Sequence, residues 1–327
     1  MQKIGGALLS LVLLACGAFA AQAQTYPDRP IRVIVSIAAG SVTDVIMRAA
    51  SADMAARLGQ PLVIENRGGA SGILAAQSCA QAAPDGYTLC VIYHSTMSYN
   101  PLLFDKLPYN ADTDLVPVAR LFFLTEGVFV NAALGVNSIA ELKALAQSKP
   151  DALNYATLGD GSFPDLFRTW LNNQWGTKIV GVPYKGGGPA AQAVAANEVQ
   201  VTRFGVGNFM GLLQAGKVKA LAVSADKRSP LLPDVPTLKE AGLNYPGQGW
   251  WGLAVPKGTP QAIVDKVNDA FVKQFSDPKF AAFLEKQSVV PATTTAAGFA
   301  SFLKEDRKAA EALIKIANTK RVEFKAQ

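Results

Sequence analysis

Histidine is almost absent from this sequence: His94 is the only one among 327 residues. A Ser–His–Asp triad would therefore have to use His94, and no G-x-S-x-G turn is present to carry its nucleophile. No H-E-x-x-H or C-x-x-C spacing occurs, so the sequence offers no zinc site. We expect a protein that is not an enzyme and holds no metal or cofactor, with an exported hydrolase based on His94 as the alternative.

Charge is also scarce. Asp, Glu, Lys and Arg make up 17% of the residues, and Lys and Arg form no run. Nucleic acid is therefore not expected as a partner. The formal net charge is +6, and it falls to +5 when Lys3 is removed with the leader described next. This small positive excess favours anionic small molecules as ligands.

The only long apolar run lies at the N-terminus. "MQK" precedes the run "IGGALLSLVLLACGAFA", and "AQA" ends at Ala23, which together predict a Sec signal peptide over residues 1–23. Lipidation of Cys16 in "LLAC" is the competing interpretation. No later run approaches the ~20 apolar residues of a membrane span. We therefore expect an exported, soluble protein, periplasmic if the source is Gram-negative.

Two cysteines, Cys79 and Cys90, follow the leader, with the turn "PDG" between them. Cys79 belongs to an expected helix and Cys90 to an expected strand. An oxidising compartment allows them to pair, but a disulfide demands a narrow facing geometry. We interpret them as two separate buried thiols, with a disulfide as the alternative.

Apolar strands alternate with helices through the chain, and the pattern restarts after residue 137. Such strands indicate parallel sheets covered on both faces. Ser138 and Glu141 predict a capping box, and Thr259 with Pro260 predicts a helix start. Strands are expected at 30–38, 61–66, 87–94, 153–158, 178–185, 199–205, 218–225 and 250–256, and helices at 43–59, 72–84, 138–150, 163–176, 259–277 and 294–318.

The C-terminal helices follow only one further strand, so they most simply complete the first domain. The chain would leave one lobe, build another and return, as in a clamshell binding protein. We expect an α/β, two-lobed fold of the periplasmic-binding-protein type, with a ligand cleft between the lobes. The first lobe is predicted over residues 24–124 plus 247–327 and the second over 125–246.

Several stretches carry a resemblance to a known family. "VIENRGGASG", "APDGYTL", "LNYATLGDGS", "VPYKGGGPA", "RSPLLPDVPT" and "WWGLAVPKGTP" occur in this order. They resemble the Bug-type extracytoplasmic solute receptors of tripartite tricarboxylate transporters, and the resemblance covers nearly all of the mature chain. It implies a receptor that binds a small carboxylate through loop backbone groups and water. The ligand would pass to a permease of one large and one small membrane subunit. A signalling receptor is the alternative, and we expect a monomer.

The stretch "VPYKGGGPAAQAV" allows two anions. Gly186, Gly188 and Ala191 fit the dinucleotide pattern G-x-G-x-x-A, but that pattern needs an acid at the end of the next strand. The next strand offers Arg203 instead, which would suit only a 2′-phosphate. The resemblance assigns this glycine turn to the ligand loop of the second lobe, so we favour a carboxylate.

Loops at the carboxyl ends of the expected strands supply the other candidate residues. In "AAGSVTD" the family often has glycine where this chain has Ser41 and Val42, and Phe204 stands where the family often has Asp. Tyr93, His94, Phe163 and Phe204 would form an aromatic cleft suited to an aromatic carboxylate, with Arg203 as its bidentate partner. Strand alternation turns one of Arg203 and Phe204 into the core. The candidate ligand-binding residues are Ala39, Gly40, Ser41, Thr43, Asp44, His94, Ser95, Thr96, Gly159, Gly161, Ser162, Phe163, Lys185, Gly186, Gly187, Arg203 and Phe204.

Overall fold

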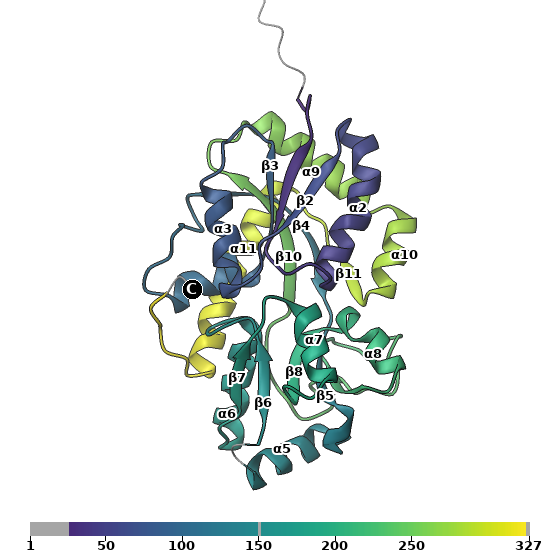
Figure 1. Cartoon of the computed structure of the whole chain (residues 1–327). Coiled ribbons are helices and arrows are strands. Elements are labelled where there is room, and N and C mark those ends of the chain that lie inside the picture. The colour runs from purple at the N-terminus through teal and green to yellow at the C-terminus, as the bar shows by residue number, and fades with distance from the viewer. Residues whose placement is uncertain (1–25, 150–151, 325–327) are drawn as a thin grey trace, which may run out of the picture.

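The computed structural model describes residues 26–149 and 152–324 and shows two lobes, one above the other in Figure 1. The expected signal peptide and Cys16 lie outside the described residues. A six-stranded sheet of order β11-β4-β10-β3-β1-β2 builds the first lobe, and a five-stranded sheet of order β7-β6-β8-β5-β9 builds the second. The α/β, two-lobed prediction is confirmed.

The first sheet is parallel only in part. Its strands are β1 (Ile31–Val35), β2 (Leu62–Asn66), β3 (Thr88–Tyr93), β4 (Leu115–Leu124), β10 (Gly249–Pro256) and β11 (Val289–Pro291). β1 pairs in parallel with β2 and β3, whereas β10 runs antiparallel to β3 and β4. β4 carries the chain out of the lobe in the same direction as β1, β2 and β3, and β10 carries it back, so β10 runs against both of its neighbours.

The second sheet also mixes parallel and antiparallel pairs. Its strands are β5 (Glu126–Asn131), β6 (Asn154–Thr157), β7 (Val180–Pro183), β8 (Val201–Gly205) and β9 (Val218–Val223). β6 is parallel to β7 and β8, and β5 is antiparallel to β8 and β9. Sheet membership changes between Leu124 and Glu126 and again between Val223 and Gly249. The lobe limits at 125 and 246 stay a prediction.

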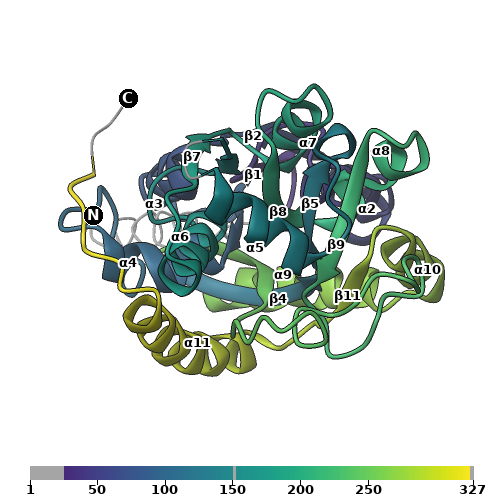
Figure 2. The same ribbon diagram turned by 90° about the horizontal axis from the view of Figure 1, so that it is seen from below.

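Helices cover both faces of each sheet (Figures 1 and 2). The first lobe carries α2 (Val42–Leu58), α3 (Ile73–Ala80), α4 (Asn100–Leu103), α9 (Gln261–Phe275), α10 (Pro278–Lys286) and α11 (Ala296–Ile316), and the second carries α5 (Ile139–Ser148), α6 (Phe163–Trp175), α7 (Gly187–Ala195) and α8 (Met210–Gln214). Two apolar clusters pack between these layers, and each draws residues from both lobes.

Two of the local predictions concern helix starts. Ser138 caps α5, because its Oγ accepts a hydrogen bond from the Glu141 amide at 3.1 Å. The expected cap of α9 is wrong by one residue: the helix begins at Gln261 with Pro260 at the N-cap position. The Thr259 hydroxyl instead donates to the Pro256 carbonyl at 2.8 Å.

The interpretation of the cysteines as separate thiols is wrong. Cys79 at the end of α3 and Cys90 in β3 form a disulfide, with their Cα atoms 6.1 Å apart. That distance lies within the usual range for a bridge. α3 packs directly on β3, and the helix therefore presents Cys79 to the strand face that carries Cys90.

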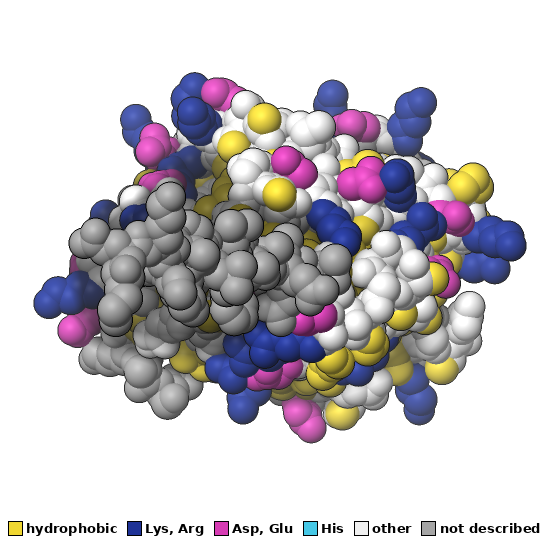
Figure 3. All heavy atoms as spheres, turned by 90° about the horizontal axis from the view of Figure 1, so that it is seen from above, with side chains coloured by type: hydrophobic (Ala, Val, Ile, Leu, Met, Phe, Trp, Pro, Cys, Tyr) yellow, Lys and Arg dark blue, Asp and Glu magenta, His cyan; other side chains and the backbone are white. Residues whose placement is uncertain are grey.

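The surface shows mixed charge. On the face seen from above in Figure 3, Lys and Arg are interspersed with Asp and Glu over the coloured atoms. Among residues 26–149 and 152–324, no helix has both the length and the apolar character to cross a membrane.

Candidate functional site

The two lobes touch through the loops at the carboxyl ends of their parallel strands. The loop between β1 and α2 meets the turn before α7, where the Ala38 amide donates to the Lys185 carbonyl at 2.9 Å. The Gly188 amide donates to the Ser41 Oγ at 3.3 Å, and the Val42 amide to the Asn208 Oδ1 at 2.9 Å. The first ligand loop and the glycine turn predicted from the sequence are thus brought face to face.

The glycines of the turn serve this close approach. Gly186 has a φ of 172°, which is extended backbone that any residue adopts. A Cβ built at Gly186 would, however, lie 2.5 Å from the Ser41 Oγ and 2.9 Å from the Ala38 Cβ. A Cβ at Gly188 would lie 3.0 Å from the Gly40 carbonyl oxygen. The missing side chains, rather than an unusual backbone conformation, let the lobes meet here.

A small cavity of about 30 Å³, called the inner cavity below, lies beneath this contact. Its walls come from both lobes and are mainly apolar. Its lining residues are Ile37, Ser41, Val42, Thr43, Tyr93, His94, Leu124, Glu126, Leu158, Pro164, Gly187, Phe204, Gly205, Asn208 and Trp251. Ser41, Thr43, His94, Gly187 and Phe204 belong to the residues expected from the sequence.

The start of α2 supplies hydrogen-bond donors to the inner cavity. Ser41 occupies the N-cap position, but its side chain does not cap the helix. Asn208 accepts from the Val42 amide, and Thr43, the next residue of the first turn, lines the inner cavity. The first turn of a helix has amides without partners in the helix, and together with the helix dipole and the Thr43 hydroxyl they favour a carboxylate.

Asp44 supports this loop from below. Its carboxylate accepts hydrogen bonds from the Gly40 amide at 2.9 Å, from Arg48 and from Asn66. Burial acts to raise the pKa of Asp44, but the hydrogen bonds from Arg48, Gly40 and Asn66 outweigh it and lower the pKa below its ordinary value. Asp44 is therefore ionised at neutral pH and positions the ligand loop without lining the inner cavity.

His94 follows β3 and precedes a π-helical turn over Ser95–Tyr99. Burial lowers the pKa of His94 to about 3, although a hydrogen bond to the Trp250 backbone opposes this shift. The ring is therefore neutral at physiological pH. Its Nδ1 atom is buried and has no hydrogen-bond partner among the described residues.

Arg203 contacts a carboxylate, but that carboxylate belongs to Glu126. The Arg203 Nη2 and Glu126 Oε2 atoms lie 2.9 Å apart, and both side chains are buried. The two groups form an ion pair without an aligned hydrogen bond. The guanidinium also lies 4.8–4.9 Å from the ring centroids of Phe163, Phe167 and Tyr245. Arg203 thus points into the second lobe, and Phe204, its neighbour on the strand, faces the inner cavity.

Burial raises the pKa of Glu126, whereas the Arg203 charge and its contact oppose the rise. Glu126 was not among the residues expected from the sequence, because it lies inside an apolar run and resembles an interrupted core segment. The only available signal was its position between two apolar stretches. The structure places it at the first crossing between the lobes, where it lines the inner cavity.

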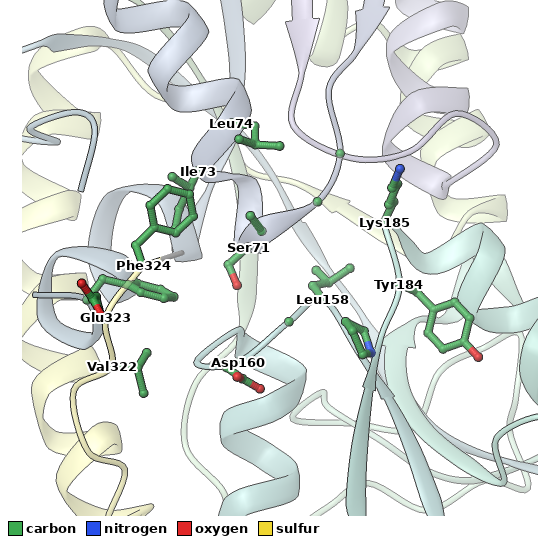
Figure 4. Close-up of a pocket in the computed structure, with 16 residues that line it drawn as sticks. Ser71, Ile73, Leu74, Leu158, Asp160, Tyr184, Lys185, Val322, Glu323 and Phe324 are labelled. Carbon is green, nitrogen blue, oxygen red and sulfur yellow. The ribbon is translucent and has the colours of Figure 1, made fainter. Parts of the chain in front are cut away.

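A larger pocket of about 580 Å³, called the outer pocket, opens beside the inner cavity (Figure 4). Leu158 lines both spaces. Lys185 extends upward from the second lobe toward the first-lobe loop, while Phe324 comes from the C-terminal segment. The lining residues are Gly68, Gly69, Ala70, Ser71, Ile73, Leu74, Phe104, Leu158, Gly159, Asp160, Pro183, Tyr184, Lys185, Val322, Glu323 and Phe324. Of the expected residues, Gly159 and Lys185 lie here.

The remaining expected residues line neither space. Thr96 closes a turn, because its Oγ1 donates to the Tyr93 carbonyl at 2.7 Å. The Ser162 Oγ accepts from the Leu158 amide at 3.2 Å. Phe163 packs against His94, with the two ring centroids 4.4 Å apart. The expected residues outside both linings are Ala39, Gly40, Asp44, Ser95, Thr96, Gly161, Ser162, Phe163, Gly186 and Arg203.

Metal ligands do not gather here. In the part of the chain that the structure describes, no group of three or more His, Cys, Asp or Glu side chains is placed to hold a metal ion.

Known proteins resemble this chain in both sequence and fold. The model of the tripartite tricarboxylate transporter family receptor matches residues 46–319. A UPF0065 protein of Bordetella bronchiseptica is 35% identical over 315 residues, which cover 96% of this chain and 93% of that protein. MatC of Rhodopseudomonas palustris, solved with malate, is 35% identical with a TM-score of 0.82, covering 88% of this chain and 100% of that chain. An R. palustris protein solved with adipate is 28% identical with a TM-score of 0.86, covering 91% of this chain and 100% of that chain. The chain therefore belongs to the tripartite tricarboxylate transporter receptor family of periplasmic solute-binding proteins.

Proposed function

We propose that this receptor captures a small carboxylate between its lobes and delivers it to a permease of one large and one small membrane subunit. The observation that carries the proposal is the start of α2, where the Ser41 side chain makes no cap and where Ser41, Val42 and Thr43 line a cavity shared by both lobes. Malate and adipate, the ligands of two structural relatives, are both carboxylates.

The proposed mechanism is hinge closure. The lobes are joined by the two crossings, at Leu124–Glu126 and between Val223 and Gly249, and few residues need to change conformation to move one sheet against the other. The ligand binds one lobe first, and the hydrogen bonds between Ala38 and Lys185 and between Ser41 and Gly188 then form over it. The permease would recognise this closed form.

Among carboxylates, we propose that aromatic acids bind best. Tyr93 and Trp251 stack with ring centroids 4.6 Å apart, and both line the inner cavity together with Phe204. Offset or edge contacts to these rings are worth ~0.5–1.5 kcal/mol per pair. Phe163 and Arg203, which supported the same idea from the sequence, are engaged elsewhere and are not part of this proposal.

The test is a thermal-shift screen of the mature protein with aliphatic and aromatic mono- and dicarboxylates, acidic amino acids and NADP. A ligand at 100 times its Kd should add about 2.7 kcal/mol of stability and raise the Tm by several degrees. Small-angle scattering with the best acid should show compaction. Stabilisation by aliphatic acids alone would refute the aromatic preference, and stabilisation by NADP alone would refute carboxylate capture.

A further inference from the structure

The outer pocket has three walls of different chemistry. Its volume of about 580 Å³ is in the range of sites that hold small organic molecules. The first lobe contributes the loop before α3, the second lobe contributes Gly159, Asp160 and Lys185, and the C-terminal segment contributes Val322 and Phe324 (Figure 4). The start of α2 lines the inner cavity instead, so a ligand in the outer pocket would be additional to the one proposed above.

Ser71 gives the first-lobe wall a hydroxyl that is available to a ligand. Its side chain is 1% exposed, and its Oγ atom has no hydrogen-bond partner among the described residues. Figure 4 shows this oxygen pointing down into the space between Phe324 and Leu158, above Asp160. Both lobes hold Ser71 at a left-handed φ of 53°, because its amide donates to the Leu158 carbonyl at 3.1 Å and its carbonyl accepts from the Asn100 Nδ2 at 3.0 Å. Most buried polar atoms have a partner, and residues with such a backbone conformation gather at ligand sites.

The start of α3 adds a preference for an anion to the same wall. Ile73 and Leu74 are the first residues of the helix and line the pocket, and Gly72 at the N-cap position has no side chain with which to cap it. The amides of a first turn have no partner inside the helix, and the helix dipole attracts negative charge. Lys185 lies beside this loop, since a Cβ built at Gly69 would lie 3.8 Å from the Lys185 Cγ. This wall therefore suits a carboxylate.

The second-lobe wall suits a positive charge. Among the described residues that line the pocket, Asp160 and Glu323 carry two negative charges against the one positive charge of Lys185. Asp160 follows Gly159, and a Cβ built at Gly159 would lie 3.9 Å from the Ser71 Oγ, so the loop of Asp160 lies next to the Ser71 hydroxyl. An ammonium group is attracted to this negative charge, whereas a second carboxylate is repelled by it.

The C-terminal wall is aromatic and is fixed to the first lobe. The Val322 amide donates to the Leu103 carbonyl at 2.8 Å, and the Val322 carbonyl accepts from the Asp105 amide at 3.1 Å. These bonds bring Phe324 to Phe104, with their ring centroids 6.1 Å apart in an edge-to-face arrangement. Both rings line the pocket, and such rings favour an apolar or aromatic group as their neighbour.

From these three walls we propose that the outer pocket binds an α-amino acid with a large apolar side chain. The carboxylate lies at Ser71 and the start of α3, the ammonium group faces Asp160, and the side chain packs against Phe104 and Phe324. Because the carboxylate contacts the first lobe and the ammonium group the second, this ligand stabilises the arrangement in which the lobes meet.

The experiment is titration calorimetry on the mature wild-type protein with phenylalanine and with three compounds that each lack one of its groups. 3-Phenylpropionate lacks the ammonium group, 2-phenylethylamine lacks the carboxylate, and alanine lacks the ring. A hydrogen bond to a charged group corresponds to roughly a tenfold to hundredfold gain in affinity, so we expect phenylalanine to bind at least about tenfold more tightly than each of them. Phenylalanine that does not bind, or binds no better than any one of the three, would overturn the inference. Stabilisation by malate or benzoate in the thermal-shift screen would then still support the proposed function.

Two variants test where phenylalanine binds. Asp160→Asn removes the exposed acid and should weaken phenylalanine roughly tenfold while leaving 3-phenylpropionate unchanged; its matched control is Asp234→Asn, an exposed acid outside both linings, which should keep the wild-type affinity. Phe324→Ala should weaken phenylalanine by roughly 2-fold to 13-fold, and Phe283→Ala in α10, also half-buried, is its control. Wild-type affinity for phenylalanine in either variant, once shown to be folded, would overturn the inference.

Discussion

Gly186→Ala tests the idea that the glycine turn exists for contact between the lobes. The backbone at residue 186 is extended, so alanine fits it without strain. Its Cβ would nevertheless lie 2.9 Å from the Ala38 Cβ and 3.0 Å from the Ala38 amide nitrogen. Real Cβ atoms rarely approach backbone that closely, and the lobes would have to separate.

The size of the effect follows from overpacking. An added methyl in a close-packed contact costs ~1–3 kcal/mol, and here only the closed arrangement bears that cost. The closed population should therefore fall by roughly 5-fold to 150-fold, and the apparent Kd for a carboxylate should rise by the same factor. The stability of the separate lobes should change little, because residue 186 packs against the other lobe.

The assay is calorimetric affinity combined with small-angle scattering at saturating ligand. Gly211→Ala in α8 is the matched control, since a Cβ there meets nothing within 4 Å. Its affinity and compaction should equal those of the wild type. Wild-type affinity and full compaction in Gly186→Ala would show that the turn does not need glycine for closure, and the reasoning would be refuted.

Three further predictions concern buried groups. Replacing both Cys79 and Cys90 by serine should lower the free energy of unfolding by about 3 kcal/mol, which is the loop-closure entropy expected for a separation of 11 residues. A Tm equal to that of the oxidised protein would contradict this prediction. His94 has its pKa depressed to about 3, so its contribution to stability is full above its unfolded value near 6.5 and is lost as the pH falls toward 3. Between pH 6.5 and 4.5 this loss amounts to about 2 kcal/mol, and denaturant titrations of His94→Gln should lack that share of the pH dependence. Arg203→Met should lower the free energy of unfolding by about 3–5 kcal/mol, because it leaves Glu126 buried without its partner. The double variant with Glu126→Gln should regain most of that stability. A folded Arg203→Met as stable as the wild type would show that the pair does not stabilise the fold.

The sequence was informative wherever a short pattern has one physical solution. Buried strands alternating with helices indicated the α/β class, and Ser138 with Glu141 located a helix start. It was uninformative where a side chain could turn either way. Arg203 and Phe204 are neighbours on one strand, and periodicity alone did not decide which of them faces the cavity.

The tertiary structure decided the rest, because these features depend on contacts between distant segments. Cys79 meets Cys90 only when α3 lies on β3. Glu126 reaches the inner cavity only because the chain changes lobes beside it, and its pairing with Arg203 joins β5 to β8. The sequence by itself determined the family, the two-lobed plan and the loops that meet. The fold decided which side chains line the cavity, since that depends on how two sheets and their crossings pack in space.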